Sequence, residues 1–578
     1  MYDQSSLRNK VREILPFLII VIIGVVYFNN ILFNPIKIPV DTYYQLSRIH
    51  NSSGSFIQFL YPQNFMSLGQ VGVATNIFYP SFIMQLIVNA IPTVSPMFSF
   101  KMFILLLFVL SGSILYCILR FKLNFEIWKS ILFAVLWAAF TTYSTSNIGG
   151  EALAKLGFPL ICFGLMNINI QGFHKYITSG ILLAIYSHLI TGAFLALFTF
   201  IYWIVTIFTK KSDKYIASIN FFKAALYSFL GSLGVTIPII IFSKTNNIKT
   251  PNVDLHQFQT WSVSLADTIS NPGISGLVFI MMFFVIITSI FVSEKINLGQ
   301  SVSVVVALFG TSSLAWEKAL LNSPITTIQM PARIFDYSLT LCFCFSLLVL
   351  KTYNDKNNHK SLYLVLTFSF LSIVASSIHK SNFPDIEKDG SMIIATNEKI
   401  TSYYKQGNDG YGLASLGAFD KSSTSNENFW SLMNYSDYVP SSALKDNKTS
   451  MLRQDDIGRN FVNHDILTEQ NRLYTTSDYT ANYNQLSFKN KKSIQSTKIK
   501  LPVLGYRSSN ISVFINGTRI PHTIKNGSIQ VFLNKTLPKS STILVKEGIP
   551  LFVIFSYILS LLSACFLFFG HKSYMSKH

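Results

Sequence analysis

The chain has 578 residues, of which 50% are hydrophobic and only 13% charged, and its formal net charge is +19. This composition excludes an ordinary water-soluble enzyme and predicts a membrane protein, in which apolar runs of about 17 to 25 residues are common. The positive charge does not indicate a nucleic-acid partner, because lysine and arginine of membrane proteins gather in cytoplasmic loops and contact anionic lipid head groups. All five cysteines lie inside apolar runs, which argues against a disulfide framework or a thiolate metal site.

The N-terminal segment starts like a signal peptide, with Arg8, Lys10 and Arg12 before an apolar run from about residue 14 to 33. No small-residue cleavage site follows, so the run is interpreted as an uncleaved first span with its N-terminus inside. Further apolar runs bring the expected transmembrane helices to about twelve, and the bias of lysine and arginine then makes both termini cytoplasmic. These runs lie at about 98–120, 130–146, 158–170, 176–190, 193–209, 219–243, 274–293, 300–316, 332–350, 361–378 and 550–570.

The expected organisation is a helical polytopic membrane protein with one inserted soluble domain. Residues 1–380 form the membrane domain, including a long first outside loop at 34–96. Between 381 and 548 the composition becomes polar, and this stretch is large enough for its own core. Its second half alternates like sheet around Asn516-Gly517 and Asn526-Gly527, which are strong hairpin signals, so a β-rich extracytoplasmic domain is predicted. Residues 549–578 supply the last helix and a short cytoplasmic tail.

The segment from Ile38 to His50 places an acid and a base just outside the first span. If it is helical from Thr42 onward, Asp41, Tyr44, Gln45 and Arg48 share one face, because they are spaced i, i+3, i+4 and i+7. Asp41 is a candidate catalytic or ligand-binding carboxylate. The alternative is that it only caps the helix. Farther along the loop, Phe78-Tyr79-Pro80 opens an apolar segment too short to cross a bilayer, which is expected to lie flat in the outer interface.

Three more candidates lie where predicted spans reach the outer face, where ionisable residues are usually functional. Glu151 follows Gly149-Gly150 and could bind substrate or a metal, or simply pair with Lys155 one turn later. His188 is either a hydrogen-bonded structural residue or a catalytic one. Arg333 stands at the start of a span, where it could meet a lipid phosphate or anchor the helix at the interface.

Several motifs are absent from the sequence. It has no Walker A phosphate loop, no H-E-x-x-H, no G-x-S-x-G and no D-x-D pair in the first outside loop. The cytoplasmic loops are also too short for a nucleotide-binding domain. If the protein is a transferase, its donor is therefore presented from the lipid side.

A series of short motifs recurs along nearly the whole chain in a characteristic order. They are V-D-T-Y-Y-Q-L-S-R-I at 40–49, Gly69, F-Y-P at 78–80, G-E at 150–151, F-P-L at 158–160, S-H at 187–188, M-P-A-R at 330–333, L-P-V-L-G-Y at 501–506 and V-F-I-N-G at 513–517. In these motifs and their order the chain resembles bacterial YfhO-like membrane proteins of the GT-C glycosyltransferase superfamily. The resemblance implies an extracytoplasmic glycosyltransferase that uses a polyprenyl-phosphate-linked sugar, with an acid in the first outside loop as general base, a role that maps onto Asp41.

The expected reaction is an inverting transfer of the sugar to a cell-surface glycan or teichoic-acid-type acceptor. Asp41 would take the acceptor proton and Arg333 would meet the departing lipid phosphate. Glu151 and Arg48 would assist, and Tyr44, Tyr79 and His188 complete the expected substrate site. Membrane lipids and an enzyme that loads the carrier lipid are the other expected partners. No cofactor is assigned, and a divalent metal is left open.

Two other classes of function are kept. One is a flippase or exporter of lipid-linked glycans, which would carry charged residues near the bilayer midplane. The other is a non-enzymatic scaffold whose soluble domain binds wall polymer through aromatic side chains. Those aromatics are Tyr403, Tyr404, Tyr411, Trp430, Tyr435 and Tyr438.

Overall fold

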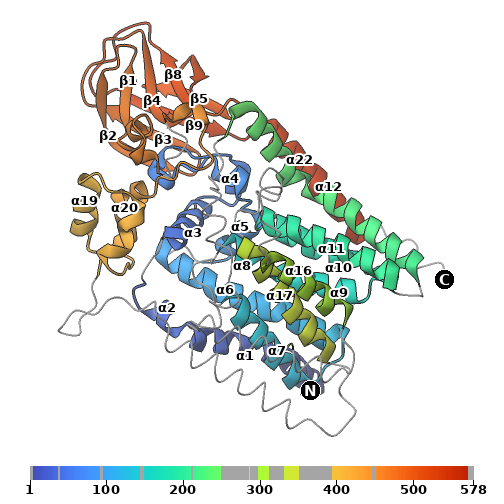
Figure 1. Ribbon diagram of the computed structural model, residues 1–578. Helices are drawn as coiled ribbons and strands as arrows, with labels where there is room; N and C mark the ends of the chain where they lie inside the picture. The colour runs from blue at the N-terminus through green and yellow to red at the C-terminus, as the bar shows by residue number, and fades with distance from the viewer. Residues whose placement is uncertain are drawn as a thin grey trace.

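The chain divides into a helical part and a strand part, with the strands gathered at one end of the packed helices (Figure 1). The computed structural model describes residues 4–36, 40–91, 95–142, 149–209, 213–248, 286, 297–311, 331–350, 394–445 and 451–569. Most of this described chain is helical, and a nine-stranded sheet precedes the last helix. Both ends of the chain lie at the end of the helical part that is remote from the strands (Figure 1).

Three helical stretches of the described chain are long and apolar enough to cross a membrane: Pro96–Lys122, Leu189–Thr209 and Lys214–Asn246. Shorter apolar helices accompany them at Glu13–Tyr27, Ile127–Thr141, Leu298–Phe309 and Leu551–Leu567. These helices indicate association with a membrane. The described residues show fewer spans than the twelve expected. The runs at 274–293 and 361–378 lie outside them, apart from Ile286.

The long helices are α1 (Gln4–Tyr27), α6 (Pro96–Cys117), α7 (Ile127–Thr141), α9 (Phe158–Met166), α10 (His174–Ile185), α11 (Leu189–Thr209), α12 (Lys214–Asn246), α16 (Leu298–Thr311), α17 (Pro331–Val349) and α22 (Leu551–Phe569). Ser95 caps the start of α6: its hydroxyl accepts a hydrogen bond from the Phe98 N–H at 3.2 Å, and Pro96 is the first residue of the helix.

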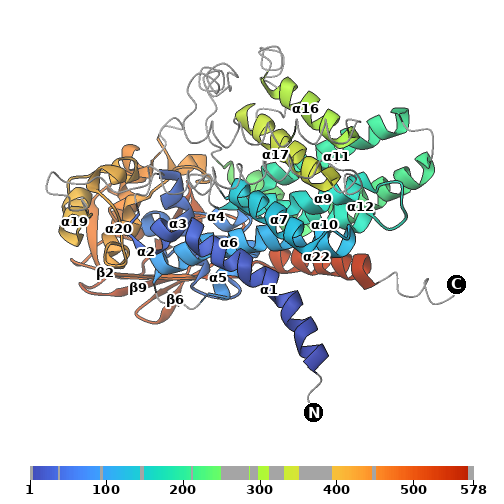
Figure 2. The same ribbon diagram turned by 90° about the horizontal axis from the view of Figure 1, so that it is seen from below.

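The last helix, α22, runs beside α12 (Figures 1 and 2), and the Ser560 hydroxyl accepts from the Gly234 N–H at 2.6 Å. A side chain at Gly234 would press on Tyr186 and Ser560, so glycine permits this close approach.

Short helices cover the end of the helical part that faces the strands (Figure 1). They are α2 (Asn29–Phe33), α3 (Val40–Ser52), α4 (Thr75–Phe78), α5 (Phe82–Asn89) and α8 (Gly150–Ala154), with 3-10 turns at Gln58–Leu60, Leu68–Gln70 and Lys155–Gly157. The helix expected from Thr42 onward is confirmed as α3. It begins at Val40, so Asp41 lies inside its first turn. The capping alternative would have placed Asp41 at the N-cap position, before the first residue of the helix. A carboxylate in a first turn still interacts favourably with the helix dipole.

The strands form one antiparallel sheet of order β6-β5-β9-β3-β2-β1-β4-β8-β7. Both predicted Asn-Gly hairpins are confirmed, joining β5 to β6 and β7 to β8. In each turn the Asn and the Gly have positive φ, 50° and 81° in the first and 49° and 64° in the second, as tight hairpin turns require. The strands are β1 (Asp465–Thr468), β2 (Leu473–Asn482), β3 (Gln485–Asn490), β4 (Lys498–Leu504), β5 (Asn510–Ile515), β6 (Thr518–Ile520), β7 (His522–Lys525), β8 (Ser528–Phe532) and β9 (Thr542–Gly548).

The sheet folds back on itself into a flattened barrel. Strand β2 bridges its two halves, pairing with β1 on one side and with β3 on the other across a register shift between Ser477 and Thr480. At the opposite side only Pro521 separates β6 from β7, the two ends of the strand order. Strands that switch between halves at bends are the usual way to enclose such a core. The core contains Ile466, Leu486, Phe488, Ile499, Val503, Val513, Ile529, Val531, Ile543 and Val545.

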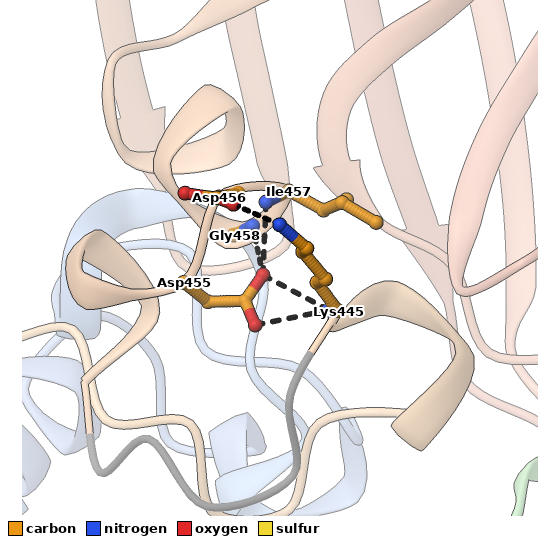
Figure 3. Close-up of polar contacts among 5 residues, drawn as sticks. All are labelled: Lys445, Asp455, Asp456, Ile457 and Gly458. Carbon is orange, nitrogen blue, oxygen red and sulfur yellow. Dashed lines mark hydrogen bonds and ion pairs between the residues drawn. The ribbon is translucent and has the colours of Figure 1, made fainter.

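The first half of the predicted β-rich domain is not sheet. Residues 394–462 form α19 (Asn397–Lys405), α20 (Glu427–Leu432) and α21 (Gly458–Val462), with 3-10 turns at Gly410–Leu416, Ser423–Ser425, Ser441–Ala443 and Leu452–Gln454. Asp455 holds this region together (Figure 3): its buried carboxylate accepts from the backbone N–H groups of Lys445, Ile457 and Gly458 at 2.9 to 3.1 Å. A carboxylate that accepts several amide hydrogens fixes a turn that no strand pairing supports.

A segment of the chain between α3 and α6, residues 58–76, docks into the strand region, and we call it the docking segment. Phe65 is fully buried within the core of the barrel. The Gln63 side-chain amide donates to the Leu504 carbonyl at 3.0 Å, and the Tyr506 hydroxyl accepts from the Ala74 N–H at 3.1 Å. The docking segment therefore completes a core whose strands come from the far end of the sequence.

Phe65→Ala is expected to lower the stability of the strand region by about 3 to 5 kcal/mol, the usual cost of emptying a buried phenylalanine site. Thermal unfolding of the detergent-purified protein, combined with limited proteolysis of residues 465–548, measures it. Phe56→Ala is the matched control, because Phe56 lies in the same loop and is 60% exposed. Equal stability of the two variants would mean that the barrel does not depend on the docking segment.

Glu547 is a buried carboxyl at the joint between β9 and the docking segment. Its Oε2 accepts from the Gln63 N–H at 3.1 Å, whereas its Oε1 has no hydrogen-bond partner among the described residues. Burial raises the pKa of Glu547 to about 8. The backbone hydrogen bond from Gln63 acts in the opposite direction and lowers this pKa. The carboxyl is therefore neutral in the folded protein at physiological pH.

Glu547→Gln is expected to make the protein more stable, increasingly so as the pH rises. Between about pH 4.5 and 8 the folded protein keeps this proton and the unfolded chain loses it, so the free energy of unfolding falls with rising pH. The amide cannot ionise, and its advantage should reach up to roughly 4 kcal/mol near pH 8 and vanish near pH 4.5. Melting temperatures at several pH values test this, with the exposed Glu469→Gln as control. Parallel pH dependence in wild type and Glu547→Gln would contradict it.

Candidate functional site

Helix α3 presents two different faces at the end of the membrane helices. On one face the Tyr43 hydroxyl donates to the Phe429 carbonyl, and the His50 ring stacks on Trp430 at 4.1 Å. This face fastens α3 to α20. The other face carries Tyr44 and Arg48 toward α8 and the Tyr79 segment.

Arg48 is a buried cation without a carboxylate partner in the described chain. It is 3% exposed and donates to Gln45 Oε1 at 2.8 Å, to the Pro80 carbonyl at 3.2 Å and to the Tyr79 carbonyl at 3.5 Å. Burial lowers the pKa of Arg48, although a guanidinium stays protonated in proteins. A buried charge compensated only by neutral acceptors is costly. Its field therefore favours an anion that could approach it.

Tyr79 lies at the centre of the cluster. The Arg48 guanidinium lies 5.1 Å from the centre of its ring, and the rings of Tyr44, Tyr438 and His188 lie at 5.2, 5.4 and 6.4 Å. The Tyr44 hydroxyl is buried without a hydrogen-bond partner among the described residues. These aromatic rings wall the space around Arg48 and keep it poor in water, which strengthens its electrostatic field.

Glu151 stands in α8, directly opposite α3. The chain enters α8 through Gly149 at φ +154°, where a side chain would collide with Gln45, so glycine is required for α3 and α8 to meet. Glu151 Oε1 forms an ion pair with Arg333 Nε at 3.3 Å and accepts a short hydrogen bond from the Tyr337 hydroxyl. The alternative of a plain ion pair with Lys155 is not what the structure has, because Lys155 pairs with Asp336 at 2.8 Å.

The charge state of Glu151 follows from its neighbours. Burial acts to raise its pKa, but its electrostatic interactions with His188, Arg333 and Lys155 and the hydrogen bond from the Tyr337 hydroxyl together lower it. Burial also lowers the pKa of His188 to about 4, so at physiological pH this ring is neutral and the two other cations hold Glu151 ionised. Glu151 is thus already committed to Arg333, and a second carboxylate, Asp437, lies close enough to act electrostatically on Tyr44, Tyr79 and Tyr438.

His188 is hydrogen bonded, as its structural interpretation predicted. Its Nδ1 lies 2.8 Å from the Thr191 hydroxyl and 3.4 Å from the Thr191 N–H, which can only donate. The proton of the neutral ring then belongs on Nε2, which has no partner among the described residues. His188 can therefore offer one N–H donor to a ligand beside Glu151 and Tyr79.

Six of the seven predicted site residues lie in one connected cluster: Tyr44, Arg48, Tyr79, Glu151, His188 and Arg333. The seventh, Asp41, lies two turns before Arg48 in α3, and its side chain is outside the described residues. Sequence reasoning missed Tyr337, although it follows Arg333 by one helical turn. It also placed Tyr438 only among candidate sugar-stacking aromatics. Tyr438 holds φ at +66°, a conformation that a bulky residue keeps only where its surroundings impose it.

A small cavity of about 10 Å³, roughly the space of one water molecule, adjoins the cluster at Pro80. Its walls come from the chain between α3 and α5 and from helices α12 and α22. They are Phe59, Asn76, Ile77, Pro80, Gly234, Val235, Pro238, Val553 and Tyr557. This space meets Pro80, whose carbonyl accepts the Arg48 hydrogen bond, but it is too small for a lipid chain.

In the described part of the chain no three His, Cys, Asp or Glu side chains gather as metal ligands would. The aromatics considered for sugar stacking are mostly packed: Trp430 is 5% exposed and donates to the Thr424 carbonyl, and the Tyr404 hydroxyl donates to the Val462 carbonyl. The side chain of Tyr411 lies outside the described residues. No family model matches the chain, and no curated protein matches it.

Proposed function

We propose that this protein is a membrane glycosyltransferase that takes a sugar from a polyprenyl-phosphate carrier and passes it to a cell-surface polymer. The observation that carries the proposal is Arg48, a buried guanidinium without a carboxylate partner in the described chain, on a helix that packs against the membrane-capable helix α6. A lipid phosphate is the anion that suits such a position, because its charge can pair with the guanidinium while its chain stays in the bilayer beside the apolar helices. The resemblance to GT-C proteins points to the same donor.

The proposal moves the main phosphate contact from Arg333 to Arg48. Arg333 already faces Glu151 at 3.3 Å, so its charge is largely neutralised. In this view the Glu151–Arg333 pair positions the sugar or the acceptor. Arg48 stabilises the negative charge that grows on the leaving phosphate, while Tyr44, Tyr79 and His188 surround the sugar.

Asp41 is proposed as the general base. The reaction needs a carboxylate that can accept the acceptor hydroxyl's proton, and the ion pair with Arg333 and the hydrogen bond from Tyr337 lower the pKa of Glu151 and make it a weaker base. Asp41 precedes Arg48 by two helical turns, roughly 10 Å along α3, a separation that leaves room for a sugar between base and phosphate. One base and one leaving phosphate correspond to a single displacement with inversion at the anomeric carbon.

The proposal places the strand region and the cluster outside the membrane and both termini in the cytoplasm. Supporting this, both ends of the chain lie at the end of the helices remote from the strands (Figure 1). The basic residues Arg8, Lys10 and Arg12 before the first apolar run point to the same side.

The test is reconstitution of the purified protein into liposomes that contain a polyprenyl phosphate bearing a radiolabelled sugar. Transfer of label to added surface polymer is expected. Movement of labelled lipid between leaflets without transfer would instead make the protein a transporter. If neither transfer nor movement occurs, both ideas are contradicted. Mass spectrometry of surface polymers from a strain that lacks the protein then identifies the acceptor.

A further inference from the structure

The strand region is strongly basic. Between residues 465 and 548 twelve lysines and arginines stand against four acidic residues, one of which is the buried Glu547. The positive-inside rule does not account for this charge, because it concerns short loops and a domain of this size translocates largely regardless of its charge. The excess therefore calls for an anionic partner.

Four exposed lysines gather at the pole of the barrel farthest from the membrane helices, and we call Lys491, Lys492, Lys535 and Lys539 the distal lysine cluster. Strand β9 runs from Thr542 to Gly548 and leads directly into α22, so its first residue marks the remote pole, roughly 20 Å from its last. Lys489 of β3 pairs with Thr542 in the sheet, so the loop that follows β3 lies at this pole too.

Hydrogen bonds join the two loops that carry the cluster, the one after β3 and the one before β9. The Asn490 side-chain amide donates to the carbonyls of Lys492 and Pro538, both at 2.7 Å. Ile494 and Leu537 exchange backbone hydrogen bonds at 2.9 and 3.0 Å. Two chain segments about forty residues apart are thus joined edge to edge, and their lysines project from one rigid surface.

The neighbouring acids compensate the cluster only in part: of them, Asp465 interacts electrostatically with Lys491, whose charge opposes the effect of burial on the Asp465 pKa. Asp478 pairs with Lys489 at 3.0 Å, and the Glu469 carboxylate accepts from the Thr497 hydroxyl at 3.2 Å. No lysine of the cluster forms an ion pair within the described chain. Four like charges on one support repel one another, and a partner that bears several negative charges would relieve that repulsion.

We propose that the distal lysine cluster binds a polyanionic surface polymer, a chain with regularly spaced phosphate groups. A lipid head group is the other source of phosphate, but the cluster faces away from the apolar helices, whereas an extended polymer can reach it. As a binding surface the cluster stands independently of the catalytic proposal. That the bound polymer is also the acceptor rests on the proposed function.

The experiment measures binding of long-chain inorganic polyphosphate to the full-length protein in nanodiscs of zwitterionic lipid, without any sugar donor. The test variant replaces Lys491, Lys492, Lys535 and Lys539 by glutamine. The control variant replaces four exposed lysines elsewhere, Lys399, Lys405, Lys421 and Lys525, and so has the same net charge. Wild type is expected to bind polyphosphate with strong salt dependence, as contacts to a dense polyanion do.

In the test variant affinity at low salt should fall at least about tenfold and the salt dependence should flatten, while the control stays within about twofold of wild type. Equal losses in both variants would reduce the effect to net charge and overturn the proposal. If wild type bound anionic vesicles through these lysines and did not bind polyphosphate, the cluster would be assigned to a membrane surface, and the proposal would also be overturned. Transfer of sugar to a small uncharged acceptor should be unchanged in the test variant, which separates this proposal from the catalytic one.

Discussion

Asp41→Asn is expected to lower sugar transfer at least about 100-fold, because a general base contributes roughly two to four orders of magnitude to such a reaction. The amide keeps the size of the side chain but cannot accept the proton. Loss of the carboxylate from the first turn of α3 should cost only about 0.3 to 1 kcal/mol of helix stability. The folded amount of protein should therefore remain close to that of wild type.

The measurement is transfer in liposomes per molecule of monodisperse protein. Asp41→Glu is the companion variant, since it retains a carboxylate and should keep part of the activity. Normal transfer by Asp41→Asn would leave this residue a helix-stabilising role only, and the base would have to be sought elsewhere.

Arg48→Ala is expected to reduce transfer by about two to three orders of magnitude, the usual consequence of removing a preorganised group that stabilises developing negative charge. Arg48→Lys should fall between alanine and wild type, because lysine keeps the charge and loses the planar fork. Binding of the donor lipid should weaken in parallel, since the same guanidinium is proposed to hold the phosphate before and after the bond breaks.

Arg453→Ala is the matched control for Arg48. Arg453 is also a buried arginine whose donors meet backbone carbonyls, those of Tyr404 at 3.0 Å and Asn408 at 2.8 Å, but it lies in the 3-10 turn Leu452–Gln454, away from the candidate site. Its removal should lower the yield of folded protein and leave transfer per molecule intact. If both alanine variants keep full specific activity, Arg48 is structural and the phosphate site is misplaced.

Local sequence signals predicted the parts of the fold that depend on local chemistry. Asn516-Gly517 and Asn526-Gly527 identified two hairpins, because only such pairs accept two consecutive positive φ angles at little cost. The apolar runs identified membrane-capable helices, because the length and composition of a helix, which are local properties, decide whether it can cross a bilayer.

Contacts between distant segments could not be predicted in this way. Phe65 looks like any loop phenylalanine in the sequence, yet it completes the barrel core. Residues 394–462 have the polar composition of the strands that follow, but their structure depends on individual hydrogen bonds such as those of Asp455. Composition carries no information about such pairings.

The site shows the same division. Periodicity placed Tyr44 and Arg48 on one face of a helix, and their proximity in the structure follows from that spacing. Helical spacing offered Lys155 as one possible partner of Glu151, whereas the fold brings Arg333 from a helix 182 positions later. Helix packing decided that contact, and no local rule could have ranked it first.

The docking segment also sets the order in which the protein can be assembled. Gln63 and Glu547, which meet in the finished joint, are 484 positions apart in the chain. At roughly 5 to 20 residues per second of synthesis, the segment waits about 25 to 100 s for the last strand of its barrel. During that interval Phe65 has no core to enter, and its loop stays open to chaperones and proteases. Closing so long a chain loop makes assembly slow, and the outer end of the molecule is then the last part of the protein to mature.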